Sequence, residues 1–343
     1  MSVDDSIEVS EQVTGHRDTL GASTRVVAWL LVVALRPFRF SSPVGRIVDG
    51  RGLRERARKL EDLGFSTLTI SDHFDLQLGP VAALMAAADA TTSLRVASLV
   101  FSNDYRHPAV LAKEAATLDL LSDGRFEFGL GAGWMESDYR QVGIAHDPAK
   151  KRVDRMEESL GVIRALWSDE PLTHRGAHYR IDGLDGTPKP ATPGGPPVII
   201  GGGGKRVMRL AARVADIVGF NPNMKAGKID EHAGPSATPE ATDNKIGWLR
   251  ESAGDRFDSL ELQIRLELAI VTDDPDPMYE VLAGGFGMSP ANARVTPHAC
   301  VGTVDEICES LIARRERWGF NYIGVPAVSV DDFAPVVARL AGT

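Results

Sequence analysis

Cysteine is almost absent from this sequence: the 343 residues include two, Cys300 and Cys308. They fall in a predicted loop and the helix that follows it, without the spacing of a metal-ligand set. Two such residues cannot build the disulfide framework of a small secreted domain, and their scarcity favours a reducing compartment. We therefore expect a cytoplasmic protein without a cysteine-based metal centre.

An excess of basic residues is also lacking. Lys and Arg number 38 against 47 Asp and Glu, and the formal net charge is -9. Because a nucleic-acid-binding face needs cations to neutralise phosphates, we expect no nucleic-acid partner. A local basic pocket for a small anionic ligand remains compatible with this balance.

Long hydrophobic runs are missing as well. The stretch Val26–Leu35 is too short to span a bilayer, and Arg36-Pro37 follow it in place of a small-residue cleavage site. We expect neither a membrane partner nor a signal peptide. Residues 1–35 are interpreted as a disordered tail or a mispredicted start, and residues 36–343 as one domain.

What the sequence does contain is an alternation of short β-type runs and amphipathic helical patterns, which is typical of a parallel sheet covered by helices. Eight such runs close a (β/α)₈ TIM barrel. The predicted strands are Phe38–Ser42, Thr67–Ser71, Leu94–Phe101, Phe126–Leu130, Pro197–Gly201, Asp216–Phe220, Leu260–Thr272 and Asn321–Val325.

Helix ends are marked by residues suited to capping. Gly64 ends the first helix, and Thr303 to Glu306 form a capping box that opens the last one, which closes near Gly319. Two stretches interrupt the alternation: Glu170–Arg180 is predicted as a hairpin, and Asn221–Asp258 as an insertion loop after strand six that acts as a mobile lid.

Residues that follow the barrel strands are the candidates for chemistry, because active sites of such barrels lie at the carboxyl ends of the strands. Asp72 and His73 follow the second strand, and an imidazole there can donate a proton or polarise a carbonyl. The alternative is a histidine that only hydrogen-bonds a loop. A dense polar run, Ser102–Pro108, follows the third strand and leads into a helix.

Two glycine clusters follow the fourth and fifth strands. Gly129–Trp134 would let a flat ring or a phosphate approach the backbone, but it also matches the glycine motif of methyltransferases that bind adenosylmethionine. That motif normally follows the first strand of an open sheet. Gly201–Gly204 precede a helix and Lys205-Arg206, which favours an anion site at the helix N-terminus, although the pattern is not a P-loop.

Two other groups give weaker signals. His174 and His178 are spaced like a metal-binding pair, yet no third ligand is near, and we expect no metal site. Lys150–Arg152 could meet the acidic tail of a ligand or could simply be a solvated helix start.

From Phe38 to the C-terminus the chain resembles the luciferase-like flavin and deazaflavin oxidoreductases, specifically the actinobacterial branch that uses coenzyme F420. The most specific parts are the runs Asn103–Pro108, Thr117–Arg125 and Gly129–Trp134. The resemblance implies a luciferase-like barrel, a homodimer, and a bulge with a non-prolyl cis peptide within Leu99–Phe101.

The resemblance also implies roles for individual residues. His73 would lie near the reacting carbon of the deazaflavin as the catalytic group, and the glycine run Gly201–Gly204 would hold the phosphate. The cofactor-binding residues implied are Asp72, Val100, Phe101, Ser102, Asn103, Ala132, Gly133, Trp134, Gly201, Gly202, Gly203 and Gly204.

One departure narrows the function. The F420-dependent sugar-phosphate dehydrogenases have a catalytic glutamate directly after the glycine run, where this chain has Trp134, and neither Glu136 nor Asp138 can be assumed to replace it. We therefore expect F420-dependent hydride transfer to or from another small organic substrate. An FMN-dependent monooxygenase is the alternative within the fold, and a methyltransferase is the alternative outside it.

Overall fold

The computed structural model describes residues 35–46, 49–75, 77–223 and 233–343. The predicted tail, residues 1–35, lies outside them except for Leu35, as does the 224–232 part of the predicted lid. Across the described ranges, no helix combines the length and the apolar character needed to span a membrane.

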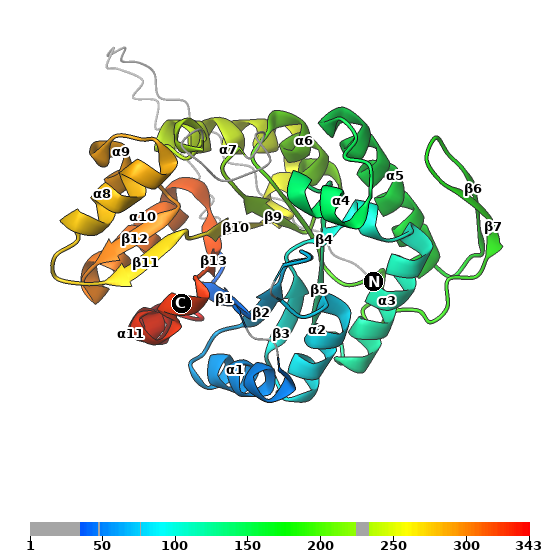
Figure 1. The fold of residues 1–343 in the computed structure, drawn as a ribbon, viewed down its shortest axis with the longest axis horizontal. Coiled ribbons are helices and arrows are strands. Elements are labelled where there is room, and N and C mark those ends of the chain that lie inside the picture. Colours follow the sequence, from blue (N-terminus) through cyan, green and yellow to red (C-terminus); the bar gives the residue numbers. More distant parts are fainter. Residues whose placement is uncertain (1–34, 47–48, 76, 224–232) are drawn as a thin grey trace, which may run out of the picture. The chain divides into compact units, whose positions relative to one another are not determined.

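Parallel strands form a closed barrel in these residues (Figure 1). Each strand pairs with the next in chain order, and β3 pairs with β5 to continue the ring. The third position is shared by β3 and the short β4, on either side of the Leu99–Val100 cis peptide. The barrel strands are β1 Arg39–Pro43, β2 Thr67–Ile70, β3 Arg95–Ser98, β4 Phe101–Ser102, β5 Phe126–Gly131, β8 Val198–Gly202, β9 Ile217–Phe220, β10 Glu261–Arg265 and β13 Phe320–Gly324.

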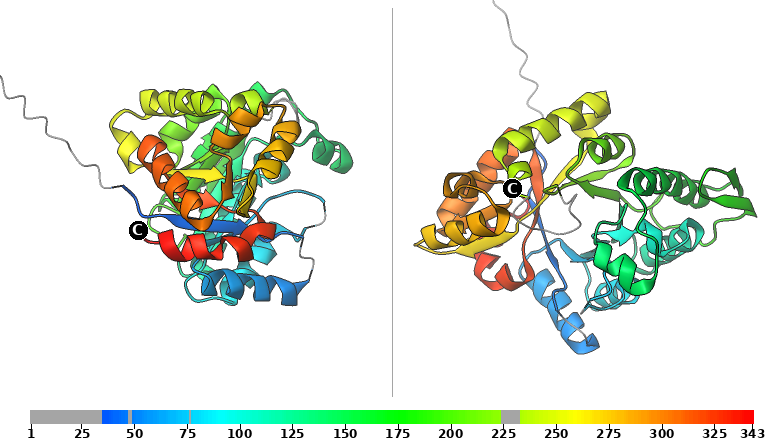
Figure 2. Two further views of the ribbon diagram at one scale, coloured as in Figure 1. Left: turned by 90° about the vertical axis from the view of Figure 1, so that its left-hand side faces the viewer. Right: turned by 45° about the horizontal axis from the view of Figure 1, so that its top comes forward.

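Helices cover the outside of this ring, as Figure 2 shows from two further directions. The chain ends beside its first strand, because Phe38 donates to the carbonyl of Thr343 and accepts from the amide of Gly342. The helices are α1 Gly50–Asp62, α2 Pro80–Asp89, α3 Pro108–Leu121, α4 Glu136–Val142, α5 Ala149–Trp167, α6 Lys205–Val214, α7 Pro239–Ala253, α8 Asp276–Phe286, α9 Pro290–Val295, α10 Val304–Trp318 and α11 Val330–Leu340.

The predicted strands and caps are largely confirmed. Each of the eight predicted runs overlaps a barrel strand. The hairpin predicted over Glu170–Arg180 is formed by β6 Leu172–Arg175 and β7 Arg180–Leu184, and so extends beyond the predicted end. Gly64 has a φ of 80°, and the capping box between Thr303 and Glu306 is present. The helix that it opens is not the last one, since α11 follows β13.

The prediction of one long strand over Leu260–Thr272 is wrong. The chain leaves the barrel after Arg265, and β11 (Leu268–Val271) instead pairs with β12 (Ala299–Gly302) in a separate two-stranded sheet. Apolar side chains of β11 and β12 join α8 and α9 in a second small core. Apolar residues recur through the whole stretch because both of its halves pack against a core, the first against the barrel and the second partly against the smaller one.

The prediction of a lid over Asn221–Asp258 is also wrong for most of that stretch. Its second half forms α7, which packs against α6 as an ordinary outer helix of the barrel. Thr238 caps the helix, Pro239 stands in its first turn, and Ile246 and Leu249 are buried at helical spacing. The larger excursion from the barrel follows the seventh strand, over residues 266–302.

A buried ion network closes the amino-terminal end of the barrel. Glu127, which is 1% exposed, accepts hydrogen bonds from Arg39 at 2.6 Å, Arg95 at 2.7 Å and the hydroxyl of Tyr322 at 3.2 Å. Arg39 also forms a two-point contact with Glu261. These charges lie where the strands begin, and the candidate functional residues lie where they end.

Candidate functional site

The carboxyl ends of the barrel strands bring the predicted site residues to one face of the barrel. The structure joins several of them directly: the rings of His73 and Trp134 meet edge to face with centroids 5.7 Å apart, and the carboxylate of Asp72 accepts from the amide of Ser102 at 3.1 Å. The loops after the second, third and fourth strands therefore form one cluster.

His73 is held by a residue that the sequence did not assign. Its Nδ1 lies 2.6 Å from Oδ2 of Asp138 on α4, whose side chain is 4% exposed, whereas that of His73 is 20% exposed. The hydroxyl of Tyr105 donates to the same oxygen at 3.4 Å. Burial and the charge of Asp138 raise the pKa of Tyr105 above its usual range, so the phenol stays protonated.

Asp72 has a structural partner in place. Its two oxygens accept from Arg106 at 2.5 Å and 3.3 Å, and one of them also accepts from the amide of Ser102. The carboxylate thereby ties the end of the third strand to the end of the second. These hydrogen bonds give Asp72 a role in holding the two strand ends together. Its contact with the cofactor stays a prediction.

The turn after β4 is anchored from α5. Arg155 binds Asp104 through two hydrogen bonds of 2.8 Å and 2.7 Å, and Tyr139 donates to the same carboxylate at 2.9 Å. Burial and Asp104 raise the pKa of Tyr139 to about 12, so it remains a donor at neutral pH. These contacts fix the loop that carries Asn103 and Tyr105.

The glycines of the fourth strand are required by the neighbouring strand. A Cβ on Gly129 would lie 2.0 Å from the carbonyl oxygen of Ser98, and one on Gly131 would lie 2.6 Å from Val100. The cis peptide expected within Leu99–Phe101 is confirmed at Leu99–Val100. The motif begins within the fourth strand of a closed barrel, so the open-sheet setting of a methyltransferase is absent from the residues that the structure describes.

Gly133 also faces protein. A Cβ there would lie 1.8 Å from the hydroxyl oxygen of Tyr139, and its φ of 76° suits glycine. Its carbonyl accepts from Arg152, which also binds the carbonyl of Ala132 at 3.1 Å. Arg152 is thus buried beneath this loop and does not form a solvated helix start.

Gly201–Gly204 connect β8 to α6, as the anion-site prediction requires. A Cβ on Gly203 would lie 2.5 Å from the carbonyl oxygen of Asn221 and 2.6 Å from that of Pro222, both in the turn after β9. A Cβ on Gly204, by contrast, would meet no other atom within 4 Å. The amides at the start of α6 therefore lie beside a fixed neighbouring turn.

A buried cation supports that turn. Lys245 on α7 is 2% exposed and donates to the carbonyls of Asn221 at 2.8 Å and Ser236 at 2.7 Å. Burial lowers its pKa to about 8. The Asn221 carbonyl oxygen that accepts from Lys245 also lies nearest to the Cβ position of Gly203. The turn Gly201–Gly204, called the glycine cradle below, therefore has a buried ammonium group behind it.

Gly203→Ala is expected to weaken binding of a phosphorylated cofactor at least roughly tenfold, because the added methyl group must displace a backbone that Lys245 holds. Calorimetric titration of the variant with the cofactor measures this loss. Gly161→Ala on α5 is the matched control, since its methyl group enters open space and Gly161 is not among the proposed cofactor-binding residues. Equal affinities of the two variants would contradict the cradle.

The remaining candidates have protein partners in the structure. His174 pairs with Glu158 at 3.0 Å, and the backbone amide of His178 binds the same carboxylate. Lys150 and Lys151 form surface pairs with Asp154 and Asp147. Over the described ranges, no group of three His, Cys, Asp or Glu residues could hold a metal ion.

The residues at the carboxyl ends of the barrel strands fit a flavin-type ring with a phosphate arm. Asn103 is 1% exposed, and its Oδ1 is buried without a hydrogen-bond partner among the described residues, so it can accept from a ring N–H group. The glycine turn before α6 offers the amides and the helix dipole that a phosphate requires. Both ends of such a cofactor thus find matching groups.

Two site residues, Asp138 and Lys245, were missed by the sequence reasoning. Asp138 lies four residues after Trp134, and its contact with His73 depends on how α4 turns back over the mouth. Lys245 lay inside the predicted lid. A lysine among buried positions of a helical pattern was the signal available there.

Comparisons with known proteins agree with this geometry. The family model described as "Luciferase-like monooxygenase" matches residues 32–241. An FMNH(2)-dependent dimethylsulfone monooxygenase of Pseudomonas fluorescens (strain Pf0-1) is 30% identical over 80% of this chain and 75% of its own length. An F420-dependent glucose-6-phosphate dehydrogenase of Nakamurella multipartita is 31% identical over 66% of each chain.

The likeness to solved structures is one of fold. An F420-dependent secondary alcohol dehydrogenase superposes with a TM-score of 0.70 at 20% identity, over 88% of this chain and 97% of its own. The match to the family model agrees with the closed barrel and with the Leu99–Val100 cis peptide, and it identifies the family. The chain belongs to the luciferase-like monooxygenase family.

Proposed function

We propose that this protein is an F420-dependent oxidoreductase that exchanges hydride between the deazaflavin and a small organic substrate. The observation that carries the proposal is the His73–Asp138 pair beside Trp134 at the barrel mouth. F420-dependent relatives of the chain support the choice of cofactor.

The residues would hold the cofactor in two places. Gly201–Gly204 and the N-terminus of α6 would bind its phosphate, and Asn103 would accept from the ring edge. Val100, Phe101, Ser102, Ala132, Gly133 and Trp134 complete the proposed ring contacts, with Asp72 at the end of β2. When bound, the deazaflavin would supply the carbon that takes up or gives hydride.

His73 would move the proton that accompanies the hydride. With Nδ1 donating to Asp138, the Nε2 lone pair is the basic atom, and an alcohol that loses hydride from carbon can give its hydroxyl proton there. The carboxylate of Asp138 then stabilises the imidazolium and fixes the orientation of the ring. The reverse transfer delivers the proton from Nε2 to a carbonyl oxygen.

An FMN-dependent monooxygenase is the second candidate, because the FMNH(2)-dependent relative matches 80% of the chain. Anaerobic assays separate the two functions: F420 with secondary alcohols, and reduced F420 with carbonyl compounds. We expect F420-linked turnover without oxygen. Substrate oxidation that requires oxygen and reduced FMN, with none linked to F420, would contradict the first candidate.

Two predictions concern the cellular location and the oligomeric state of the enzyme. A cytoplasmic location is supported by the two cysteines, which are buried and free. A homodimer is a family-level expectation, and light scattering of the purified protein would test it.

A further inference from the structure

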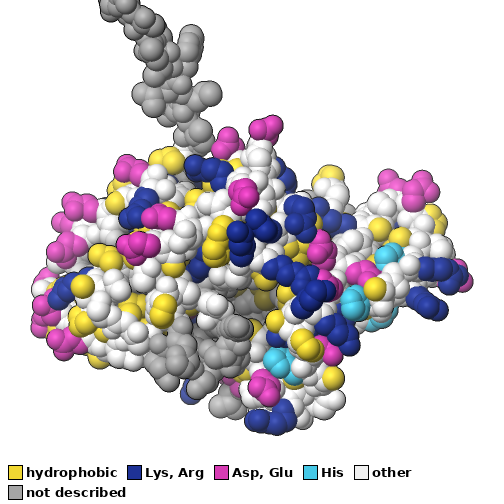
Figure 3. Space-filling view, turned by 90° about the horizontal axis from the view of Figure 1, so that it is seen from above, with side chains coloured by type: hydrophobic (Ala, Val, Ile, Leu, Met, Phe, Trp, Pro, Cys, Tyr) yellow, Lys and Arg dark blue, Asp and Glu magenta, His cyan; other side chains and the backbone are white. Residues whose placement is uncertain are grey.

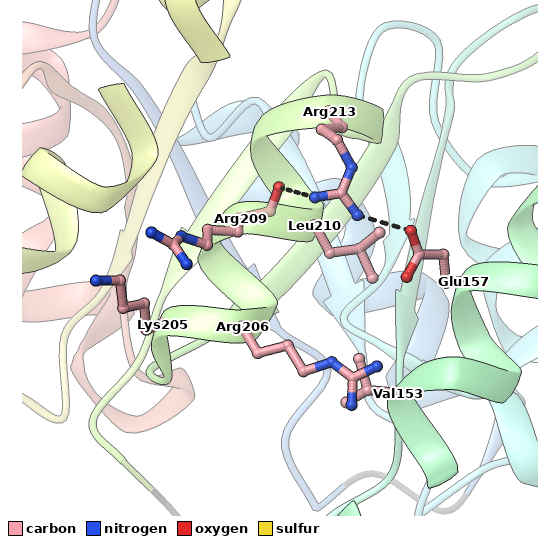
Figure 4. A pocket seen from close by; sticks show the side chains of 7 residues that line it. All are labelled: Val153, Glu157, Lys205, Arg206, Arg209, Leu210 and Arg213. Atoms are coloured by element: carbon pink, nitrogen blue, oxygen red, sulfur yellow. Dashed lines mark hydrogen bonds and ion pairs between the residues drawn. The ribbon is translucent and has the colours of Figure 1, made fainter. Parts of the chain in front are cut away.

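A buried lysine lies behind the turn that faces the glycine cradle. Lys245 on α7 is 2% exposed, whereas three arginines that Figure 4 shows on α6, namely Arg206, Arg209 and Arg213, have side chains that are 44% to 51% exposed. Figure 3 shows Lys and Arg side chains gathered on the face of the molecule that carries α5 and α6. Salt screens such surface charges strongly, and it screens the charge of a buried ammonium much less.

The Lys245 ammonium joins two backbone segments. It donates to the carbonyl of Asn221, in the turn after β9, and to that of Ser236, in the short 3₁₀ helix Gly234–Ser236 that precedes α7. The Asn221 oxygen also lies 2.5 Å from the Cβ position of Gly203. The ammonium is therefore one hydrogen bond away from an atom that forms the wall of the cradle.

A neutral imidazole lies on the other side of this junction. His298 is 1% exposed, and its Nδ1 lies 3.1 Å from the carbonyl oxygen of Arg265, to which it can donate. Burial and the charge of Lys245 lower the pKa of His298 to about 3, so the ring carries no charge at neutral pH. Close by, the hydroxyl of Thr296 donates to the carbonyl of Ala237 at 2.6 Å and fixes the chain that leads from Ser236 into α7.

No carboxylate pairs with Lys245 among the residues that the structure describes, and burial by itself lowers the pKa of this lysine to about 8. The other charged groups around α7 have partners of their own, namely Arg209 with Glu251, Asp243 with Arg317, and Lys205 over the ring of Trp248. An anion brought into the cradle would therefore be a new counter-charge for this ammonium.

We propose that Lys245 is a positioning residue for the cofactor phosphate, and that the phosphate binds together with the proton of Lys245. This inference rests on the proposed function. Lys245 would act through the Asn221 carbonyl, which it holds against Gly203, and through its charge. A bound phosphate favours the ammonium over the neutral amine.

The sign of the pH dependence follows from this preference. Cofactor affinity is highest below the pKa that Lys245 has in the free protein, where the ammonium is already present. It falls as the pH rises through that pKa, because binding must then also take up a proton. It becomes constant again once the amine stays neutral in the complex as well.

Calorimetric titration of the full chain with F420, between about pH 7 and pH 9.5 and in two buffers of different ionisation enthalpy, measures both affinity and proton uptake. We expect roughly tenfold weaker binding at the alkaline end, and uptake of up to about half a proton near pH 8.5. Because Lys245 is buried, most of this uptake should persist at about 0.5 M NaCl.

Lys245→Met removes the charge and keeps the length of the side chain. We expect it to bind F420 roughly tenfold more weakly than the wild type at pH 7, without the proton uptake near pH 8.5. Lys245→Gln retains an N–H donor but cannot titrate in this range, and it replaces the first variant if circular dichroism shows that Lys245→Met does not fold.

Lys189→Met is the matched control. Lys189 also donates to two backbone carbonyls, those of Leu166 and Ser168, but these lie at the end of α5. This variant keeps the affinity and the proton uptake of the wild type.

Two results would overturn the inference: a wild-type affinity that is the same at pH 7 and pH 9.5, or proton uptake that survives the loss of Lys245. The first needs no variant, so it decides the question even if both Lys245 variants fail to fold. Both results leave the proposed function intact, whereas failure of the wild type to bind F420 at pH 7 refutes that function first.

Discussion

Replacing His73 with alanine is expected to lower kcat roughly 10²–10⁴-fold, the range typical for loss of a positioned acid–base group. Binding of the cofactor should stay within about twofold, because the proposed phosphate and ring-edge contacts are made by Gly201–Gly204 and Asn103, whereas His73 pairs with Asp138. Stopped-flow measurement of deazaflavin absorbance, on the substrate found by anaerobic assay, gives the rate. Calorimetry gives the affinity.

Asp138→Asn tests the contribution of the Asp138 carboxylate separately from that of the His73 imidazole. The amide keeps the shape of the carboxylate but not the charge that would stabilise the imidazolium, so kcat should fall while folding is kept. His178→Ala is the control, since its ring lies in the β6–β7 hairpin, away from Asp138. If His73→Ala lost cofactor binding with its fold intact, the division between chemistry and binding would be wrong.

Glu127→Gln is expected to destabilise the barrel by about 3–5 kcal/mol, because it leaves two largely buried arginines without their shared carboxylate. The glutamine also places an amide N–H group where three donors now converge. Urea unfolding followed by circular dichroism measures the change in the free energy of unfolding.

The same variant has a predicted pH dependence. Burial alone would raise the pKa of Glu127, but Arg39 and Arg95 outweigh it and hold that pKa below its usual value. A carboxylate of this kind stabilises the fold above its unfolded-state pKa and loses that contribution as the pH falls. The difference between wild type and Glu127→Gln should therefore shrink in acid.

Asp331→Asn provides the control for this experiment. Asp331 pairs with Lys59 at 2.5 Å, but their side chains are 70% and 46% exposed. Loss of so exposed a pair should change the free energy of unfolding by less than about 1 kcal/mol. A Glu127→Gln effect as small as this would show that the buried network does not stabilise the barrel.

The barrel could be predicted because short runs of β-forming residues alternate regularly with amphipathic helical patterns. Thr303 and Gly319 placed one helix almost to the residue. The sequence pattern could not show that the chain leaves the barrel after Arg265 and then packs against a second core. Apolar residues recur in both halves of Leu260–Thr272, and the partner strands distinguish β10 from β11.

The site could be predicted where a residue follows a strand directly. His73 and the Gly201–Gly204 turn belong to that class. Asp138 does not, because it reaches His73 from α4 across 65 residues. The basic residues of α6 were partly visible as Lys205-Arg206, but the position of Arg209 and Arg213 relative to α5 depends on how the two helices pack.

The central claim is a deazaflavin site at the barrel mouth, and side-by-side calorimetric titration of the purified apoprotein with F420 and FMN tests it most directly. We predict micromolar or tighter binding of F420 and weaker binding of FMN, as the proposed F420-dependent function requires. Micromolar binding of FMN without binding of F420 would contradict the account.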